Sequence, residues 1–140
     1  MGLERFKTAQ ENDYNIALSE IKSGHKRSHW MWYIFPQIAG LGMTRTSTYY
    51  AIKDIREATD YLLDTELGLR LVTICRALLE LETNDPHVVF GSPDDLKLKS
   101  SMTLFDAVPV TFPVFGQVLD KFYGSERDSR TLELLSSGRA

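Results

Sequence analysis

The chain contains very little cysteine and no long apolar run. Cys75 is the single cysteine among 140 residues, so no disulfide can form within the chain, which is typical of reducing compartments. It lies in an apolar run over residues 71–75, which predicts a buried, unreactive thiol. No segment approaches the roughly 20 apolar residues of a membrane-spanning helix, and the first residues lack the apolar stretch of a signal peptide. We therefore expect a cytoplasmic protein that does not associate with membranes.

An excess of positive charge is missing as well. The chain has 16 Lys and Arg against 19 Asp and Glu, which gives a formal net charge of -3. Domains that bind nucleic acid are usually basic, so we expect no nucleic-acid partner. Internal repeats, low-complexity segments and linkers are also absent, and this length can bury a core of its own. We predict one domain over residues 1–140, with disorder only in the first few residues and in residues 136–140.

What the chain does contain is helical periodicity along most of its length. Gly24 is a natural end for the first helix. Asp54 and Glu57 have the spacing of a capping box, which begins a later helix. A wide apolar face over about residues 66–82 indicates a helix at the centre of the fold. The sequence predicts an all-α, compact fold of several helices with little or no strand.

Residues 26–43 form the most informative stretch, because they hold both tryptophans. Trp30 and Trp32 indicate either a core seam or the wall of a pocket. We expect residues 30–35 to form a short buried helix that packs against the central helix. His29, just before it, is a candidate acid, base or hydrogen-bond donor. The alternative for His29 is a structural position at the start of this helix.

The end of this stretch supplies further polar groups. Gln37 follows a proline, where the chain must turn, and its amide can contact either a ligand or a neighbouring loop. Gly40 and Gly42 would allow the backbone to approach an anion, although a plain turn is the alternative. This pair lacks the spacing and the Lys-Ser/Thr ending of a phosphate-binding loop. Arg45 is the nearest cation that could pair with a phosphate or carboxylate.

A second polar cluster follows residues 88–90, which indicate a short extended piece. Ser92 has the position of a helix cap, and Asp95 in the first turn is either a ligand contact or a compensation of the helix dipole. Lys97 and Ser101 then lie one turn apart on this helix. We expect them to face the aromatic block and to share one polar cleft with His29. A solvated helix face is the alternative.

The sequence gives no sign of a metal or cofactor. The three histidines, His25, His29 and His87, show no ligand spacing with nearby carboxylates, so no metal site is predicted. No cofactor motif occurs, and a nucleophile-elbow motif is absent. The candidate catalytic residues are therefore His29, Lys97 and Ser101. The candidate ligand-binding residues are Trp30, Trp32, Gln37, Gly40, Gly42, Arg45 and Asp95.

Several blocks of the chain together resemble a bacterial family known as domain of unknown function 1810. The most specific block runs over residues 29–37, and others include residues 3–6, 40–42, 67–71, 100–105 and 128–132. The resemblance covers the whole chain and implies a compact, mostly helical single domain without an established activity. Some members carry the label calpastatin, which implies a disordered inhibitor made of repeats. This chain has neither property, so we discount that label.

Two functions from different classes remain open at this stage. The first is a site for a small molecule, nucleotide-like or ADP-ribose-like, in a cleft lined by His29, Trp30, Gln37, Arg45 and Lys97; whether it is catalytic is left open. The second is a protein-interaction module that presents the same aromatic segment as a surface patch. The two differ in whether the tryptophans are recessed or exposed. The sequence leaves the oligomeric state open.

Overall fold

Regular structure in this protein is helical. The computed structural model describes residues 2–137, and no strand is formed within that range. The helices are α1 (Glu4–Ser23), α2 (Met31–Ile34), α3 (Arg45–Tyr49), α4 (Ile55–Leu63), α5 (Thr65–Leu79), α6 (Pro86–Phe90), α7 (Asp94–Asp106), α8 (Pro113–Tyr123) and α9 (Ser129–Ser137). The predicted all-α class is confirmed. Of residues 136–140, expected to be disordered, 136 and 137 lie in α9, and the others are outside the described residues.

Local sequence signals set several helix ends. Asp54 Oδ1 accepts a hydrogen bond from the Glu57 amide at 3.0 Å and begins α4, as predicted. Glu57 Oε1 reaches back to the amide of Lys53 at 2.8 Å, one residue before the position that the capping box predicts. Gly24 and Gly124 adopt left-handed backbone conformations, with φ of 89° and 61°, and end α1 and α8.

Two local predictions around residue 90 are wrong. Residues 88–90 are helical rather than extended, because Asp85 caps α6 through the His87 amide at 2.9 Å and Pro86 takes the first helical position. Ser92 does not cap α7. That helix begins at Asp94, and the carbonyl of Pro93 accepts from the amides of residues 96 and 97 instead.

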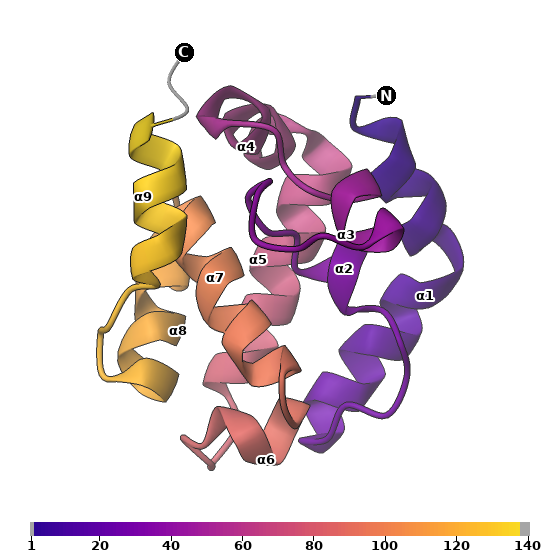
Figure 1. Cartoon of the computed structure of the whole chain (residues 1–140). Helices are drawn as coiled ribbons and strands as arrows, with labels where there is room; N and C mark the ends of the chain where they lie inside the picture. Colours follow the sequence, from indigo (N-terminus) through magenta and orange to yellow (C-terminus); the bar gives the residue numbers. More distant parts are fainter. Residues whose placement is uncertain (1, 138–140) are drawn as a thin grey trace.

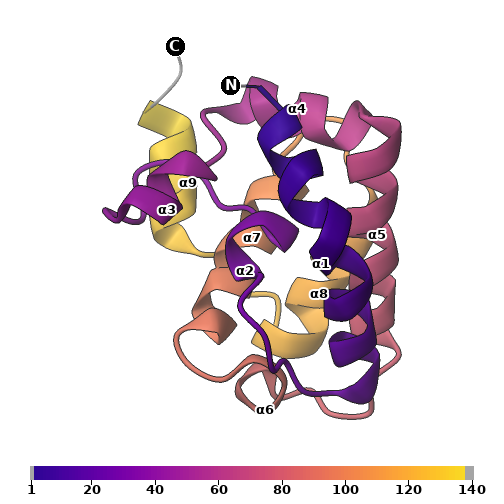
Figure 2. The ribbon, with the colours of Figure 1, turned by 90° about the vertical axis from the view of Figure 1, so that its right-hand side faces the viewer.

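The helices enclose one continuous core. Helix α5 packs against α1, α4 and α8, and α7 packs against α4, α6, α8 and α9. Figure 1 shows α1 at the right and α8 and α9 at the left. Figure 2, turned by 90°, places α5 at one edge and α3 and α9 at the opposite one. None of the helices within residues 2–137 is long and apolar enough to cross a lipid bilayer.

Helix α2 has a different main partner from the one predicted. It packs mainly against α1 rather than against α5. Gln10 of α1 donates to the carbonyl of Tyr33 at 2.8 Å, and Glu20 of α1 accepts from the indole N–H of Trp30 at 3.0 Å. These polar side chains of α1 fix the aromatic segment, a constraint that apolar periodicity does not reveal.

Candidate functional site

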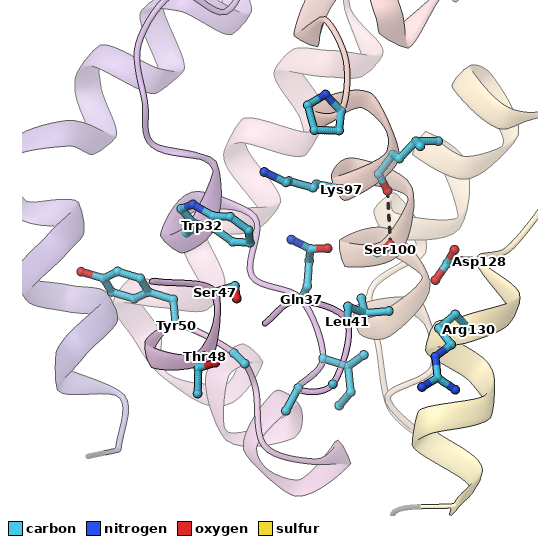
Figure 3. A pocket seen from close by; sticks show the side chains of 17 residues that line it. Trp32, Gln37, Leu41, Ser47, Thr48, Tyr50, Lys97, Ser100, Asp128 and Arg130 are labelled. Carbon is cyan, nitrogen blue, oxygen red and sulfur yellow. Dashed lines mark hydrogen bonds between the residues drawn. The ribbon is translucent and has the colours of Figure 1, made fainter. Parts of the chain in front are cut away.

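A cleft of about 310 Å³ opens where the loop of residues 37–42 meets α7 and the start of α9. Figure 3 shows the Gln37 side chain in the middle, between Trp32 on one side and Ser100 of α7 on the other. Residues of α3 and the segment after it complete one wall. The volume is near the lower end of the range of about 300–1,000 Å³ that is typical of small-molecule sites. The cleft is lined by Trp32, Gln37, Ile38, Ala39, Gly40, Leu41, Gly42, Ser47, Thr48, Tyr50, Ala51, Pro93, Leu96, Lys97, Ser100, Asp128 and Arg130.

The loop of this cleft is held by backbone bonds at its start and close packing at its end. Ile52 donates to the carbonyl of Gln37 at 2.8 Å, and Ala39 donates to the carbonyl of Ile52 at 2.8 Å. Gly40 has a φ of 105°, and a Cβ there would lie 3.0 Å from Leu134 of α9. A Cβ on Gly42 would lie 2.6 Å from Ser47 Oγ. The two glycines therefore allow the loop to fit between α3 and α9.

Three partly buried polar groups of the cleft have no hydrogen-bond partner among residues 2–137. They are the amide of Gln37, the indole N–H of Trp32 and the hydroxyl of Tyr50, all on partly buried side chains. Burial raises the pKa of Tyr50, with a further contribution from Tyr49, so its hydroxyl keeps its proton at neutral pH. Each group is free to bond with water or with a ligand.

Charged side chains hold in place the wall of the cleft that Trp32 and Lys97 of α7 form. Lys97 Nζ lies 3.9 Å from the centre of the Trp32 ring, which is a cation–π contact, and 3.2 Å from Asp94 Oδ1. Asp94 Oδ2 in turn lies 2.9 Å from Lys26 Nζ. The ion pairs hold Lys97 in place and connect α7 to the segment before α2. Trp32 and Lys97 thus present an aromatic ring and a cation side by side.

The structure separates the residues of the predicted shared cleft. Of the ten candidates, five line the observed cleft: Trp32, Gln37, Gly40, Gly42 and Lys97. The other five candidates, which lie elsewhere, are His29, Trp30, Arg45, Asp95 and Ser101.

Trp30 belongs to the core. Its side chain is 1% exposed, and its N–H is satisfied by Glu20. His29 is exposed and does not line the cleft; the Tyr33 hydroxyl donates to its carbonyl at 3.3 Å. The expectation that His29 and Lys97 share one cleft is therefore wrong. The short α2 helix directs Trp32 to the cleft, whereas residues 29 and 30 precede that helix and point elsewhere.

Arg45, Asp95 and Ser101 also lie away from the cleft. Arg45 lines a second hollow beside α3. The Asp95 carboxylate accepts from the Leu96 amide at 2.9 Å and lies 3.6 Å from His87, at the start of α7. Ser101 is fully buried, and its hydroxyl has no partner among the described residues. The cleft is lined by residue 93, just before α7, and by residues 96, 97 and 100 of α7, so Ser100 takes the place predicted for Ser101.

The lining residues that were not predicted as site residues include Tyr50, Ser100, Asp128 and Arg130. Tyr50 and Asp128 occur in blocks that support the family resemblance, and the Asp128 carboxylate caps α9 through the Thr131 amide at 2.9 Å. Ser100 donates to the carbonyl of Leu96 at 3.2 Å. Arg130 is an exposed residue near the start of α9, 3.2 Å from Glu133. No local pattern marks Arg130, because α9 meets the cleft only through tertiary packing.

The arrangement offers hydrogen bonding, an aromatic wall and two cations. No histidine or cysteine is among the described residues that line it. Cys75 is buried, and burial raises the pKa of its thiol, in agreement with the predicted unreactive cysteine. Within residues 2–137, no group of three or more His, Cys, Asp or Glu side chains is placed to hold a metal ion.

Comparison with known proteins identifies the family. No functionally curated protein matches the chain. Among solved structures, the crystal structure of the conserved hypothetical protein Rv1873 from Mycobacterium tuberculosis matches with a TM-score of 0.92 and 40% sequence identity, over 95% of each chain. The family model described as Protein of unknown function (DUF1810) matches residues 1–135. The chain therefore belongs to the DUF1810 family, to which its sequence motifs pointed.

Proposed function

We propose that the cleft binds a small, planar, polar molecule of the size of a nucleobase or nucleoside. The observation that carries this proposal is the amide of Gln37, which lies in the middle of the cleft without a hydrogen-bond partner among residues 2–137. A glutamine amide offers a donor and an acceptor side by side, which matches the edge of a nucleobase.

The neighbours of Gln37 support the same class of ligand. Trp32 supplies an aromatic ring, and aromatic side chains commonly contact unpaired bases. Tyr50 adds a hydroxyl donor. Lys97 and Arg130 line the cleft together with the Asp128 carboxylate, so the lining carries one more cation than anions. The small volume favours a nucleoside-sized ligand over a complete ADP-ribose.

The alternative of a protein-interaction surface has less support. It depends on exposed tryptophans with Arg45 at the rim. Trp30 is 1% exposed, and Arg45 belongs to a different hollow. A single partly buried Trp32 offers little area for a protein partner. We place the proposed binding in the cytoplasm on the composition of the chain.

Thermal denaturation with a panel of nucleobases, nucleosides and ADP-ribose tests the proposal. A ligand that binds only the folded state raises the melting temperature by mass action. At a free ligand concentration about 100 times Kd, the free energy of unfolding rises by about 2.7 kcal/mol. Gln37→Ala is expected to abolish this shift. Gln117→Ala, on an exposed position of α8, is the matched control and should keep it.

His29→Ala separates the structure-based site from the sequence-based one. His29 lies off the cleft, so this variant should bind like the unmodified chain. A panel in which no compound raises the melting temperature would contradict the proposal. The same holds if Gln37→Ala and Gln117→Ala respond equally to the compound that binds.

A further inference from the structure

We propose that a second hollow beside α3 binds a small anionic molecule that carries phosphate or carboxylate groups. This hollow has a volume of about 750 Å³ and is more open than the cleft. Helix α3 stands between the two: Ser47 faces the cleft, Arg45 and Tyr49 face the second hollow, and Thr48 touches both. The start of α1 and the residues around the start of α4 form the rest of its lining.

Two of the residues that line this hollow, Arg5 and Glu57, form an ion pair, so together they add no net charge. The guanidinium of Arg5 contacts both Glu57 carboxylate oxygens, at 3.2 and 3.3 Å. It also donates to the carbonyls of Tyr49 and Ala51, at 2.7 Å each. Glu57 Oε1 additionally accepts the amide of Lys53 at 2.8 Å. Both oxygens of the one carboxylate in the lining are therefore already engaged.

The remaining charges of the hollow are both positive. Arg45 and the ammonium group of Lys53 are exposed and have no ion-pair or hydrogen-bond partner within the described part of the chain. The lining thus carries a local excess of two positive charges in a protein with a net charge of -3. Arginine offers a planar fork of donors that suits phosphate and carboxylate, and lysine adds a mobile charge.

The side chains next to these two cations favour an organic anion over an inorganic ion as the ligand. Tyr49 is 46% exposed and Met43 is 93% exposed, and both line the same hollow. They offer an apolar surface beside the two cations, so an organic anion gains contacts that an inorganic ion does not. Two unpaired cations are too few for tight binding to a nucleic-acid backbone, which needs many phosphate contacts.

Titration of the full chain with anions, followed by the chemical shifts of backbone amides, tests this proposal. Pyrophosphate and citrate serve as the phosphate and carboxylate probes. We expect saturable shifts at residues 43–49 and 53 with at least one probe, and the probe that binds identifies the preferred group. Arg45→Ala should weaken that affinity at least about tenfold. Lys53→Ala should act in the same direction, and added salt should weaken binding further.

Arg76→Ala is the control, because Arg76 is an exposed arginine of α5 outside both hollows. It should leave the affinity unchanged, as should Gln37→Ala, which separates this site from the cleft. Equal effects of Arg45→Ala and Arg76→Ala would show non-specific attraction and overturn the proposal. It is equally overturned if neither pyrophosphate nor citrate gives saturable shifts.

Discussion

Arg5 is the residue on which most of the polar contacts near the N-terminus depend. Its side chain is 6% exposed and reaches across 44 to 52 residues of sequence to the carbonyls of residues 49 and 51 and to Glu57. It also donates to the carbonyl of Gly2, and its guanidinium lies 4.3 Å from the centre of the Phe6 ring. A single side chain thus connects α1 to the segments on both sides of residue 52.

Replacing Arg5 should destabilise the fold strongly. Arg5→Ala leaves Glu57 with only the Lys53 amide as a donor and removes the donor of three carbonyls. Breaking a buried ion pair costs about 3–5 kcal/mol. Arg5→Lys should restore only part of the loss, because an ammonium group cannot reproduce the arginine fork. Urea denaturation measures the free energy of unfolding. Arg56→Ala, at an exposed position of α4, is the control and should change it by less than about 0.5 kcal/mol.

An Arg5→Ala variant as stable as the Arg56→Ala control would show that the contacts of Arg5 contribute no net stability. Arg5 illustrates what sequence reasoning does not provide at the residue scale. It appears in a block that supports the family resemblance, yet nothing nearby in sequence signals its partners. Trp30 is a similar case, because its partner Glu20 lies on another element. Burial and pairing of single residues depend on tertiary contacts.

At the scale of elements, the loop of residues 37–42 depends on the absence of side chains. Gly42 lies so close to α3 that a Cβ would be 2.6 Å from Ser47 Oγ and 2.7 Å from Ser47 Cβ. Ser47 itself is buried and donates to the carbonyl of Thr44 at 2.9 Å. The loop and α3 are therefore in direct contact along one wall of the cleft, and their spacing sets its width.

Gly42→Ala should force the loop away from α3. Overpacking of this kind typically costs about 1–3 kcal/mol, and the displaced wall should weaken any ligand of the cleft. In a double-mutant cycle, Ser47→Gly removes both clashing atoms. The double variant should therefore be more stable than the sum of the two single effects predicts, as calorimetry can measure. Strict additivity would mean that the loop accommodates the methyl group without contact.

The sequence predicted helices better than it predicted the cleft, for a physical reason. Helix ends depend on neighbouring residues, so Gly24 and Asp54 had the predicted roles. The cleft depends on which side of α7 faces the loop. Ser100 and Ser101 are 100° apart around the helix, and periodicity does not distinguish them when both sides are partly polar. Placement of residues 128 and 130 requires knowledge of where α9 packs.

At the scale of the whole molecule, stability should depend on pH through Glu20. Burial would raise the pKa of this carboxylate, but hydrogen bonds from Ser28, from the Arg27 amide and from Trp30 outweigh it and lower the pKa to about 2. The ordinary value is 4.5. Because the folded state has the lower pKa, this stabilisation is complete above about pH 5 and is lost as the pH falls towards 2.

Glu20→Gln should flatten this acid dependence. The free energy of unfolding, measured by urea denaturation between pH 2 and 7, should fall less steeply in the variant than in the unmodified chain. At pH 7 the variant should be less stable by about 1–2 kcal/mol, since an amide is a weaker acceptor than a carboxylate. Glu80→Gln, at an exposed position, should reproduce the unmodified profile. If the free energy of unfolding depends on pH in the same way in both variants, Glu20 is not the cause of the loss of stability in acid.

The position of Arg5 has a consequence for how the chain is made. Synthesis proceeds from the N-terminus, so α1 emerges from the ribosome before the segments that receive its buried polar groups. The partners of Arg5 lie in residues 49–57, the side chain of Gln10 bonds to Tyr61, and the hydroxyl of Tyr14 donates to the carbonyl of Arg70. All of these partners are synthesised after α1. Burying these groups without partners is costly. Helix α1 is therefore unable to bury these polar groups with their partners until the segments up to residue 70 have followed it.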